Sequence, residues 1–130
     1  MMDDLTTKEM MDLPAGRLLD GCMYMNILGG EVKTIGFIQI PGGKRYEERY
    51  ADWAKLPKYS ADIGAAFALL FKLHGNDVEL KYMDTTVDWL CRLFLGYGSD
   101  EEAIGTADGH EDGAALAICR ALIQRKEILK

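Results

Sequence analysis

The sequence contains little of what several functional classes require. It has 15 basic residues against 21 acidic ones and a formal net charge of −6, which argues against a general nucleic-acid-binding protein. No apolar run approaches the roughly 20 residues of a membrane-spanning helix. The start, MMDD, is acidic where a secretory signal peptide is basic. We therefore expect a cytoplasmic protein that binds neither DNA or RNA nor a membrane.

Cysteine and histidine are also scarce, which limits disulfide, metal and catalytic chemistry. Cys22, Cys91 and Cys119 each lie in an apolar stretch, which favours reduced thiols in the core over disulfides. His110 lies in the acidic run 108–112, from which a general base or a metal site can be built. A solvated loop is the more common fate of such a run. Because nucleophile and phosphate-binding motifs are missing, we expect no enzyme, no metal and no cofactor.

Length and composition predict one globular domain spanning residues 1–130. With 130 residues, 48% hydrophobic and 28% charged, the chain is long enough for one sizeable core. The segment from about 31 to 55 is expected to be a hairpin or a long loop inserted in this domain. Its first half is rich in β-branched residues, and the turn sequence PGG at 41–43 separates it from a polar second half.

Helical patterns occur in several parts of the chain. We predict a short capped turn at 6–12 and helices at about 15–28, 61–74 and 112–129. Pro14 suits the first position of the helix at 15–28. Ser60 is the predicted N-cap of the central helix, whose buried face is expected to contain Ile63, Ala66, Phe67, Leu70 and Phe71. The last helix is expected to bury Leu116, Cys119, Leu122 and Ile123.

Strand patterns follow the central helix. Residues 77–83 alternate between apolar and polar side chains, which predicts a strand with one wet face. Residues 86–95 are apolar on both faces apart from Arg92, and this indicates helices on both sides of the sheet. A third strand is expected at 101–106, with a loop at 105–110. The predicted fold is α+β, a three-layer α/β/α sandwich with a mainly antiparallel sheet, and its core should include Phe67, Leu70, Trp89, Leu93, Leu116 and Cys119.

Three short stretches resemble the signature stretches of a family of small phage proteins. They read LPAGRLLD at 13–20, YSADIGAA at 59–66 and AICRAL at 117–122. In their order and approximate spacing they are similar to the phage ABA sandwich domain family. The resemblance implies an α/β/α sandwich and a phage or prophage context, but no agreed activity. The segments at 31–53 and 107–113 are longer here than in the family, and such loops can carry a member's own function.

Basic and aromatic residues are interleaved between residues 44 and 59, the most cationic part of this acidic chain. Aromatic rings stack on bases, and arginine or lysine binds phosphate. The start of the central helix offers backbone N–H groups to a phosphate, and Arg120 can complete a pocket across a subunit interface. The alternative is a solvated hairpin whose tyrosines cover the edge of the core. The predicted ligand-binding residues are Arg45, Tyr46, Arg49, Tyr50, Trp53, Tyr59, Ser60 and Arg120.

These features favour a non-enzymatic phage-type protein that sequesters a nucleotide-derived immune signal in the host cytoplasm. A cyclic nucleotide or an ADP-ribose-type molecule would be the ligand, and its capture would counter bacterial anti-phage defence. The chain loosely resembles phage nucleotide-sponge proteins in size and α+β make-up. The alternatives are a protein–protein interaction module that blocks a host or phage protein, and a virion accessory protein. The apolar residues of the two long helices predict a homo-oligomer.

Overall fold

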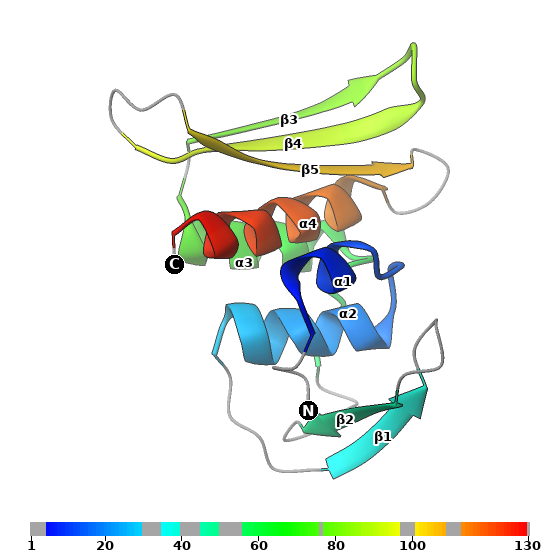
Figure 1. Cartoon of the computed structure of the whole chain (residues 1–130). Coiled ribbons are helices and arrows are strands. Elements are labelled where there is room, and N and C mark those ends of the chain that lie inside the picture. Colours follow the sequence, from blue (N-terminus) through cyan, green and yellow to red (C-terminus); the bar gives the residue numbers. More distant parts are fainter. Residues whose placement is uncertain are drawn as a thin grey trace.

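Helices and two antiparallel sheets make up the computed structural model (Figure 1). It describes residues 5–29, 35–39, 45–49, 56–75, 77–96, 101–108 and 113–129, with only the backbone at 35–39 and 45–49. The elements are α1 (Thr7–Met11), α2 (Arg17–Cys22), η2 (Met23–Ile27), β1 (Ile35–Gln39), β2 (Arg45–Arg49), α3 (Ile63–Leu73), β3 (Val78–Met83), β4 (Asp88–Phe94), β5 (Glu102–Asp108) and α4 (Gly113–Ile128). The last strand runs to Asp108, so the loop predicted to begin at residue 105 is wrong for 105–108.

Helix α4 packs closely along the three-stranded sheet, against β5 and β4. The sheet is antiparallel with β4 in the centre. Strand β5 turns small residues towards the helix, and a Cβ atom at Gly105 would collide with the α4 backbone at Ala117 and Ala121. A glycine at this position therefore allows the helix to lie directly on the strand.

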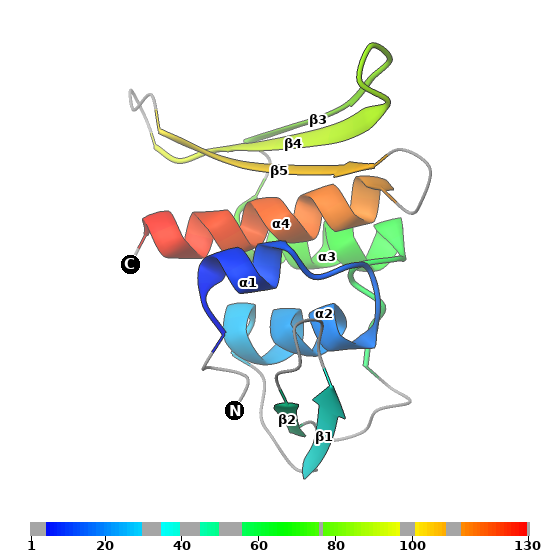
Figure 2. The same cartoon turned by 45° about the vertical axis from the view of Figure 1, so that its right-hand side comes forward.

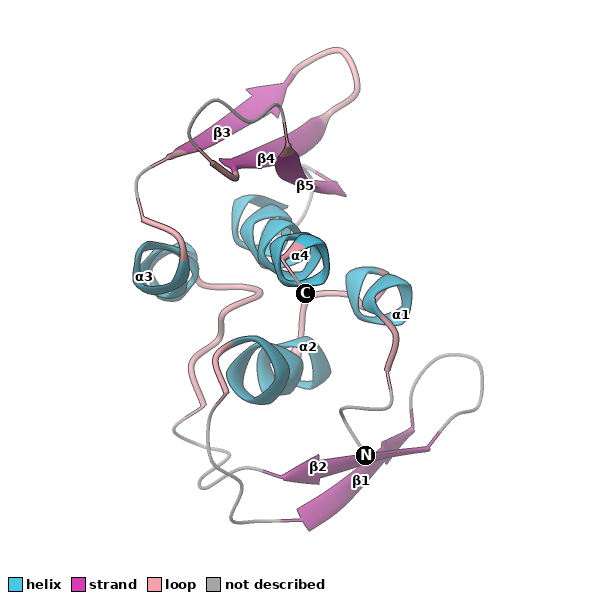
Figure 3. Ribbon diagram, turned by 60° about the vertical axis from the view of Figure 1, so that its left-hand side comes forward, coloured by secondary structure: helices cyan, strands magenta, loops and turns pink. Residues whose placement is uncertain are grey.

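The described helices all lie on one face of this sheet (Figures 1 and 3). The prediction of helices on both sides of β4 is therefore wrong for the described residues. Cys91 and Leu93 share the face that carries α4, whereas Leu90 points to the other face and is nevertheless buried. Its cross-strand neighbours are Lys81 and Thr106, and long side chains within a sheet can cover an apolar neighbour. The α+β class with an antiparallel sheet is confirmed.

Most of the predicted core is buried. The structure buries Leu70, Leu93, Leu116 and Cys119, and it packs the half-buried Phe67 and Trp89 against them. The core lies where α4 meets the sheet on one side and the other helices on the opposite side (Figure 2). All three cysteines are buried and free, as predicted.

The central helix α3 differs from its prediction at its start and on its buried face. Its N-cap is Asp62, whose carboxylate accepts the Gly64 N–H at 2.9 Å. The assignment of Ser60 as N-cap is wrong, because the Ser60 hydroxyl is engaged inside the core. Ile63 and Phe71 were predicted to be buried, but they are 41% and 50% exposed.

Near the N-terminus, the structure confirms the capped turn predicted at 6–12 and places the start of the next helix later than predicted. Thr6 and Glu9 form a capping box at the start of α1. Helix α2 begins only at Arg17 after Gly16, so Pro14 lies before the helix and not at its first position. From Met23 the chain continues as the π-helix η2, a rare form that often occurs at functional sites.

Strands β1 and β2 form a separate antiparallel pair in which Ile35 is opposite Arg49 and Gln39 is opposite Arg45. The pair lies beyond α2, on the side of the helices away from the three-stranded sheet (Figures 1 and 2). Among the described residues, no helix has the length and apolar character needed to cross a bilayer.

Candidate functional site

A buried hydrogen-bond network joins the start of α2 to the turn before α3. The Ser60 hydroxyl donates to Asp20 Oδ1 at 2.6 Å, and the Ser60 backbone N–H donates to the same oxygen at 2.9 Å. The Gly16 N–H donates to the Ser60 hydroxyl at 2.8 Å. Asp20 is 2% exposed and Ser60 is fully buried. Water cannot reach either side chain, so these hydrogen bonds satisfy their polar atoms in its place.

Helix α4 completes this network from the third stretch of the sequence. The Cys119 thiol donates to the Tyr59 carbonyl at 3.2 Å. The Arg120 guanidinium donates to the carbonyl oxygens of Thr106 and Leu13, at 2.9 Å and 3.1 Å. Residues of the stretches 13–20, 59–66 and 117–122 are therefore bonded to one another. Together they hold the helices and the three-stranded sheet in place.

The network suits a structural role better than catalysis. Burial raises the pKa of the Asp20 carboxyl, although the hydrogen bonds from Ser60 and the charges of Arg17 and Lys58 act in the opposite direction. Burial also raises the pKa of the Tyr59 hydroxyl, and this residue is 7% exposed. The side chains of Tyr59 and Ser60 are therefore closed to a ligand from solvent in this structure.

The predicted ligand-binding residues do not form one described cluster. Tyr59 and Ser60 lie in the core, and Arg120 is half-buried and bonded to backbone carbonyls. The backbones of Arg45, Tyr46 and Arg49 lie in β2, without described side chains. Two further predicted residues, Tyr50 and Trp53, and residues 109–112 of the acidic run lie outside the described residues. Within the described ranges, no group of three His, Cys, Asp or Glu side chains is placed to hold a metal ion.

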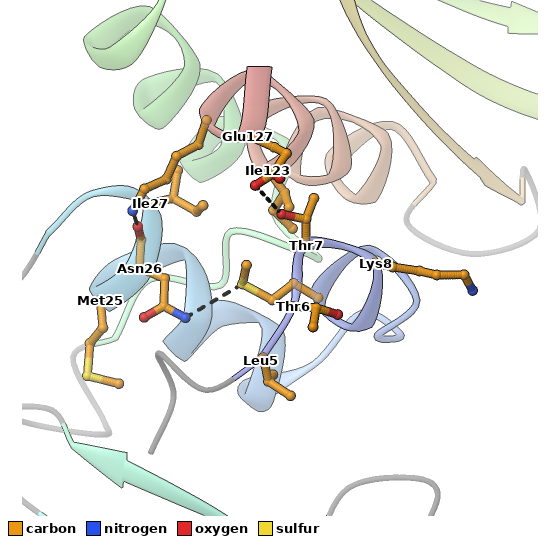
Figure 4. A pocket seen from close by; sticks show the side chains of 11 residues that line it. Leu5, Thr6, Thr7, Lys8, Met25, Asn26, Ile27, Ile123 and Glu127 are labelled. Atoms are coloured by element: carbon orange, nitrogen blue, oxygen red, sulfur yellow. Dashed lines mark hydrogen bonds between the residues drawn. The ribbon is translucent and has the colours of Figure 1, made fainter. Parts of the chain in front are cut away.

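A pocket of about 670 Å³ opens between α1, η2 and the C-terminal half of α4 (Figure 4). Apolar side chains from all three elements line it, together with polar groups from the same segments. The lining residues are Leu5, Thr6, Thr7, Lys8, Met10, Met25, Asn26, Ile27, Ile123, Lys126 and Glu127. These segments are far apart in the sequence and carry no recognisable motif, so sequence reasoning missed the site.

Hydrogen bonds hold the walls of the pocket together. The Thr7 hydroxyl donates to the Glu127 carboxylate at 2.7 Å, which ties α1 to α4 (Figure 4). Lys126 Nζ donates to the Asn26 carbonyl, and the Asn26 amide points towards the sulfur of Met10 at 3.6 Å. Because the π-helix places Met25, Asn26 and Ile27 on the wall, its irregular turn shapes the pocket.

Comparison with known proteins supports the fold. No protein-family model matches the sequence, and no curated protein matches it. Among solved structures, the fold is similar to the crystal structure of a phage protein from Bacillus cereus. The TM-score is 0.54 at 22% sequence identity, over 87% of this chain and 93% of that chain. At this identity the likeness concerns the fold, and function must be argued from the site.

Proposed function

We propose that this chain is a non-enzymatic phage protein that binds and sequesters a nucleotide-derived immune signal in the pocket between α1, η2 and α4. The pocket's size carries the proposal. Its volume of about 670 Å³ lies within the roughly 300–1,000 Å³ of small-molecule sites. Capture of a cyclic nucleotide or an ADP-ribose-type signal would act in the cytoplasm of an infected cell and counter its defence.

The lining of the pocket fits a ligand with one apolar face and several polar groups. Met10, Met25 and Ile123 offer an apolar surface, and methionine adapts to the shape of planar groups such as bases. Lys126 stands at the same pocket and supplies positive charge for a phosphate, whereas Lys8 points outward and pairs with Asp12 at 3.1 Å (Figure 4). The hydroxyl groups of the α1 start and the amide of η2 add hydrogen-bonding partners for a ribose or a base edge.

Two further observations support the phage context and the ligand class. The B. cereus protein of similar fold is described as a phage protein, in agreement with the resemblance of the stretches 13–20, 59–66 and 117–122 to the phage ABA sandwich family. Basic and aromatic residues are concentrated between residues 44 and 59, and these residue types suit base stacking and phosphate binding.

The environment of His74 supports a non-enzymatic role. The Arg125 Nε–H donates to His74 Nδ1 at 3.0 Å, and His74 Nε2 lies 3.0 Å from the Asp77 carbonyl oxygen. Both ring nitrogens are thus engaged by groups of the fold. Ser60, a possible nucleophile beside a carboxylate, is fully buried.

A thermal-shift screen against linear and cyclic nucleotides tests the proposal. A ligand present at 100 times its dissociation constant stabilises the folded state by about 2.7 kcal/mol. Asn26→Trp fills the pocket and should abolish the shift, whereas Leu129→Trp, at an exposed position outside the lining, should keep it. Lys126→Ala should weaken binding and reduce its dependence on salt, because exposed phosphate contacts are screened.

The result that contradicts the proposed site is a nucleotide shift of equal size in the wild type and in Asn26→Trp. In that case the basic and aromatic segment becomes the site to test. Removal of one stacking ring costs about 1–3 kcal/mol of binding free energy, so Trp53→Ala and Arg120→Ala would then be compared by calorimetry. Absence of a shift with every nucleotide tested, supported by calorimetry, would refute the ligand class.

A second candidate function is a protein–protein interaction module, and the sheet face without described helices favours it. Phe94 and Ile104 are exposed there, at 37% and 38%, near the buried Leu90. Apolar residues on an open sheet face are a common feature of interaction surfaces. Ile104→Glu should abolish capture of a protein partner, while it should leave nucleotide binding at the pocket unchanged.

A further inference from the structure

Helix α3 turns an apolar face outward. This outer face of α3 consists of Ile63, Gly64, Phe67, Ala68 and Phe71, of which all but the half-buried Phe67 are exposed. The rings of Phe67 and Phe71 stack with their centroids 5.6 Å apart. The opposite side of the same helix buries Ala66, Leu69 and Leu70. From residue 63 to residue 71 the helix carries no charge, and a helix that is apolar on all sides normally lies in an interior.

We propose that the outer face of α3 binds the same face of a second copy of this chain, with the two helices antiparallel about a two-fold axis. A two-fold contact requires a self-complementary surface. Small and large residues alternate along the outer face of α3. Gly64 and Phe71 lie seven residues apart and are therefore on the same line of the helix. In an antiparallel pair, Phe71 of each copy meets Gly64 of the other, and Phe67 meets Ala68.

The charges at the two ends of α3 favour the same arrangement. Asp62 precedes the helix and Lys72 lies in its last turn, and both are exposed. Antiparallel pairing brings Asp62 of each copy next to Lys72 of the other, whereas parallel pairing brings like charges together. Exposed ion pairs add little affinity, but they select the orientation. The antiparallel order also opposes the two helix dipoles.

The length of α3 limits the strength of the contact. Its 11 residues span about 16 Å at 1.5 Å per residue. One face of so short a helix buries less than the roughly 800 Å² that each partner buries in a standard interface. We therefore expect a dissociation constant of about 1–100 μM, near the weak end of the range for specific complexes.

Light scattering over a concentration series tests the dimer. The wild type should move from 14.5 kDa towards twice that mass as its concentration rises through this range. Phe71→Glu should raise the dissociation constant at least about tenfold, because it buries a charge at the contact. Phe94→Glu changes the same residue type on the open sheet face and should dimerise as the wild type does. A wild type that stays at 14.5 kDa, or a dimer lost in Phe94→Glu and kept in Phe71→Glu, overturns the proposal.

Disulfide cross-linking tests the antiparallel arrangement with a variant that introduces no charge into α3. Ala68→Cys places a thiol near the two-fold axis, and the three native cysteines are buried and should contribute little background. Under mild oxidation Ala68→Cys should form a covalent dimer, and Ile104→Cys, exposed on the open sheet face, should not. Lys72→Glu should weaken the dimer of the otherwise native chain. The proposal is overturned if Ala68→Cys cross-links no more than Ile104→Cys at a concentration where the wild type is dimeric.

Discussion

Removal of the Asp20 carboxylate probes the centre of the fold. Asp20→Ala takes away the oxygen that accepts both the hydroxyl and the backbone N–H of Ser60, and it leaves that buried N–H without its acceptor. Asp20→Asn keeps an oxygen in the same place and removes the charge. The two variants therefore separate the hydrogen bonds from the burial of a charge.

The expected magnitudes differ between the two variants. A hydrogen bond to a charged group contributes about 1.5–3 kcal/mol, so loss of both should cost roughly 3–6 kcal/mol in Asp20→Ala. Asp20→Asn should lower the free energy of unfolding by about 1 kcal/mol, because its hydrogen bonds remain but no longer go to a charged group. The coupling between Asp20→Ala and Ser60→Ala should be about 0.5–3 kcal/mol, because the two side chains share the contact.

The charge of Asp20 should also appear in the pH dependence. Burial holds the folded-state pKa of this carboxyl above its ordinary value of 3.8, so the folded state binds more protons than the unfolded state between the two values. The free energy of unfolding that this group contributes therefore rises as the pH falls through that window. The wild type should gain stability relative to Asp20→Asn as the pH falls from above the raised pKa towards 3.8.

Urea unfolding followed by circular dichroism at several pH values measures all of these quantities. The difference between Asp20→Asn and the wild type isolates this carboxyl from the others, because the other groups titrate alike in both chains. The reasoning is refuted if Asp20→Ala costs less than about 1 kcal/mol, or if the wild type loses stability relative to Asp20→Asn as the pH falls.

Other parts of the fold give simpler expectations. Gly105→Ala should cost about 3 kcal/mol in urea unfolding, because its Cβ meets the α4 backbone. Gly64→Ala, whose Cβ meets only Asp62 Oδ1 at 3.4 Å, should change stability by less than about 1 kcal/mol. Thr6→Ala should cost about 1 kcal/mol and speed amide exchange in α1, because the capping box is lost. All three cysteines are buried, and burial raises the pKa of Cys91 to about 12. A thiol reagent should therefore leave them unmodified in the folded protein and react with all three after denaturation.

The periodicity of apolar residues predicted those helices and strands well that bury one side against the core. Strands β3 and β4 and helix α4 were located within a few residues, because one side of each packs on the same core. The start of α3 was misplaced for a non-local reason. Ser60 and Asp62 both make good caps, and the hydroxyl of Ser60 is instead taken by Asp20, 40 residues earlier. The residues next to Ser60 in the sequence do not reveal that its hydroxyl bonds to Asp20 and does not cap α3.

Surface exposure was harder to predict than element type. Ile63 and Phe71 fit a helical stripe with Phe67, but α4 packs against the side of α3 that carries Ala66, Leu69 and Leu70. The pocket escaped prediction for a similar reason, since three distant segments build it. Its outline depends on the π-helical turn η2, and a π-helical turn has no reliable sequence signature.

Ligand retention tests the central claim most directly. The wild type and Asn26→Trp would be purified from phage-infected bacteria in which the defence signal is produced, and each would be heated to release bound molecules for mass spectrometry. The account predicts a nucleotide-derived molecule released by the wild type in near-stoichiometric amount, and little or none from Asn26→Trp. Equal release from both proteins would contradict the pocket, and the absence of any nucleotide from the wild type would contradict sequestration.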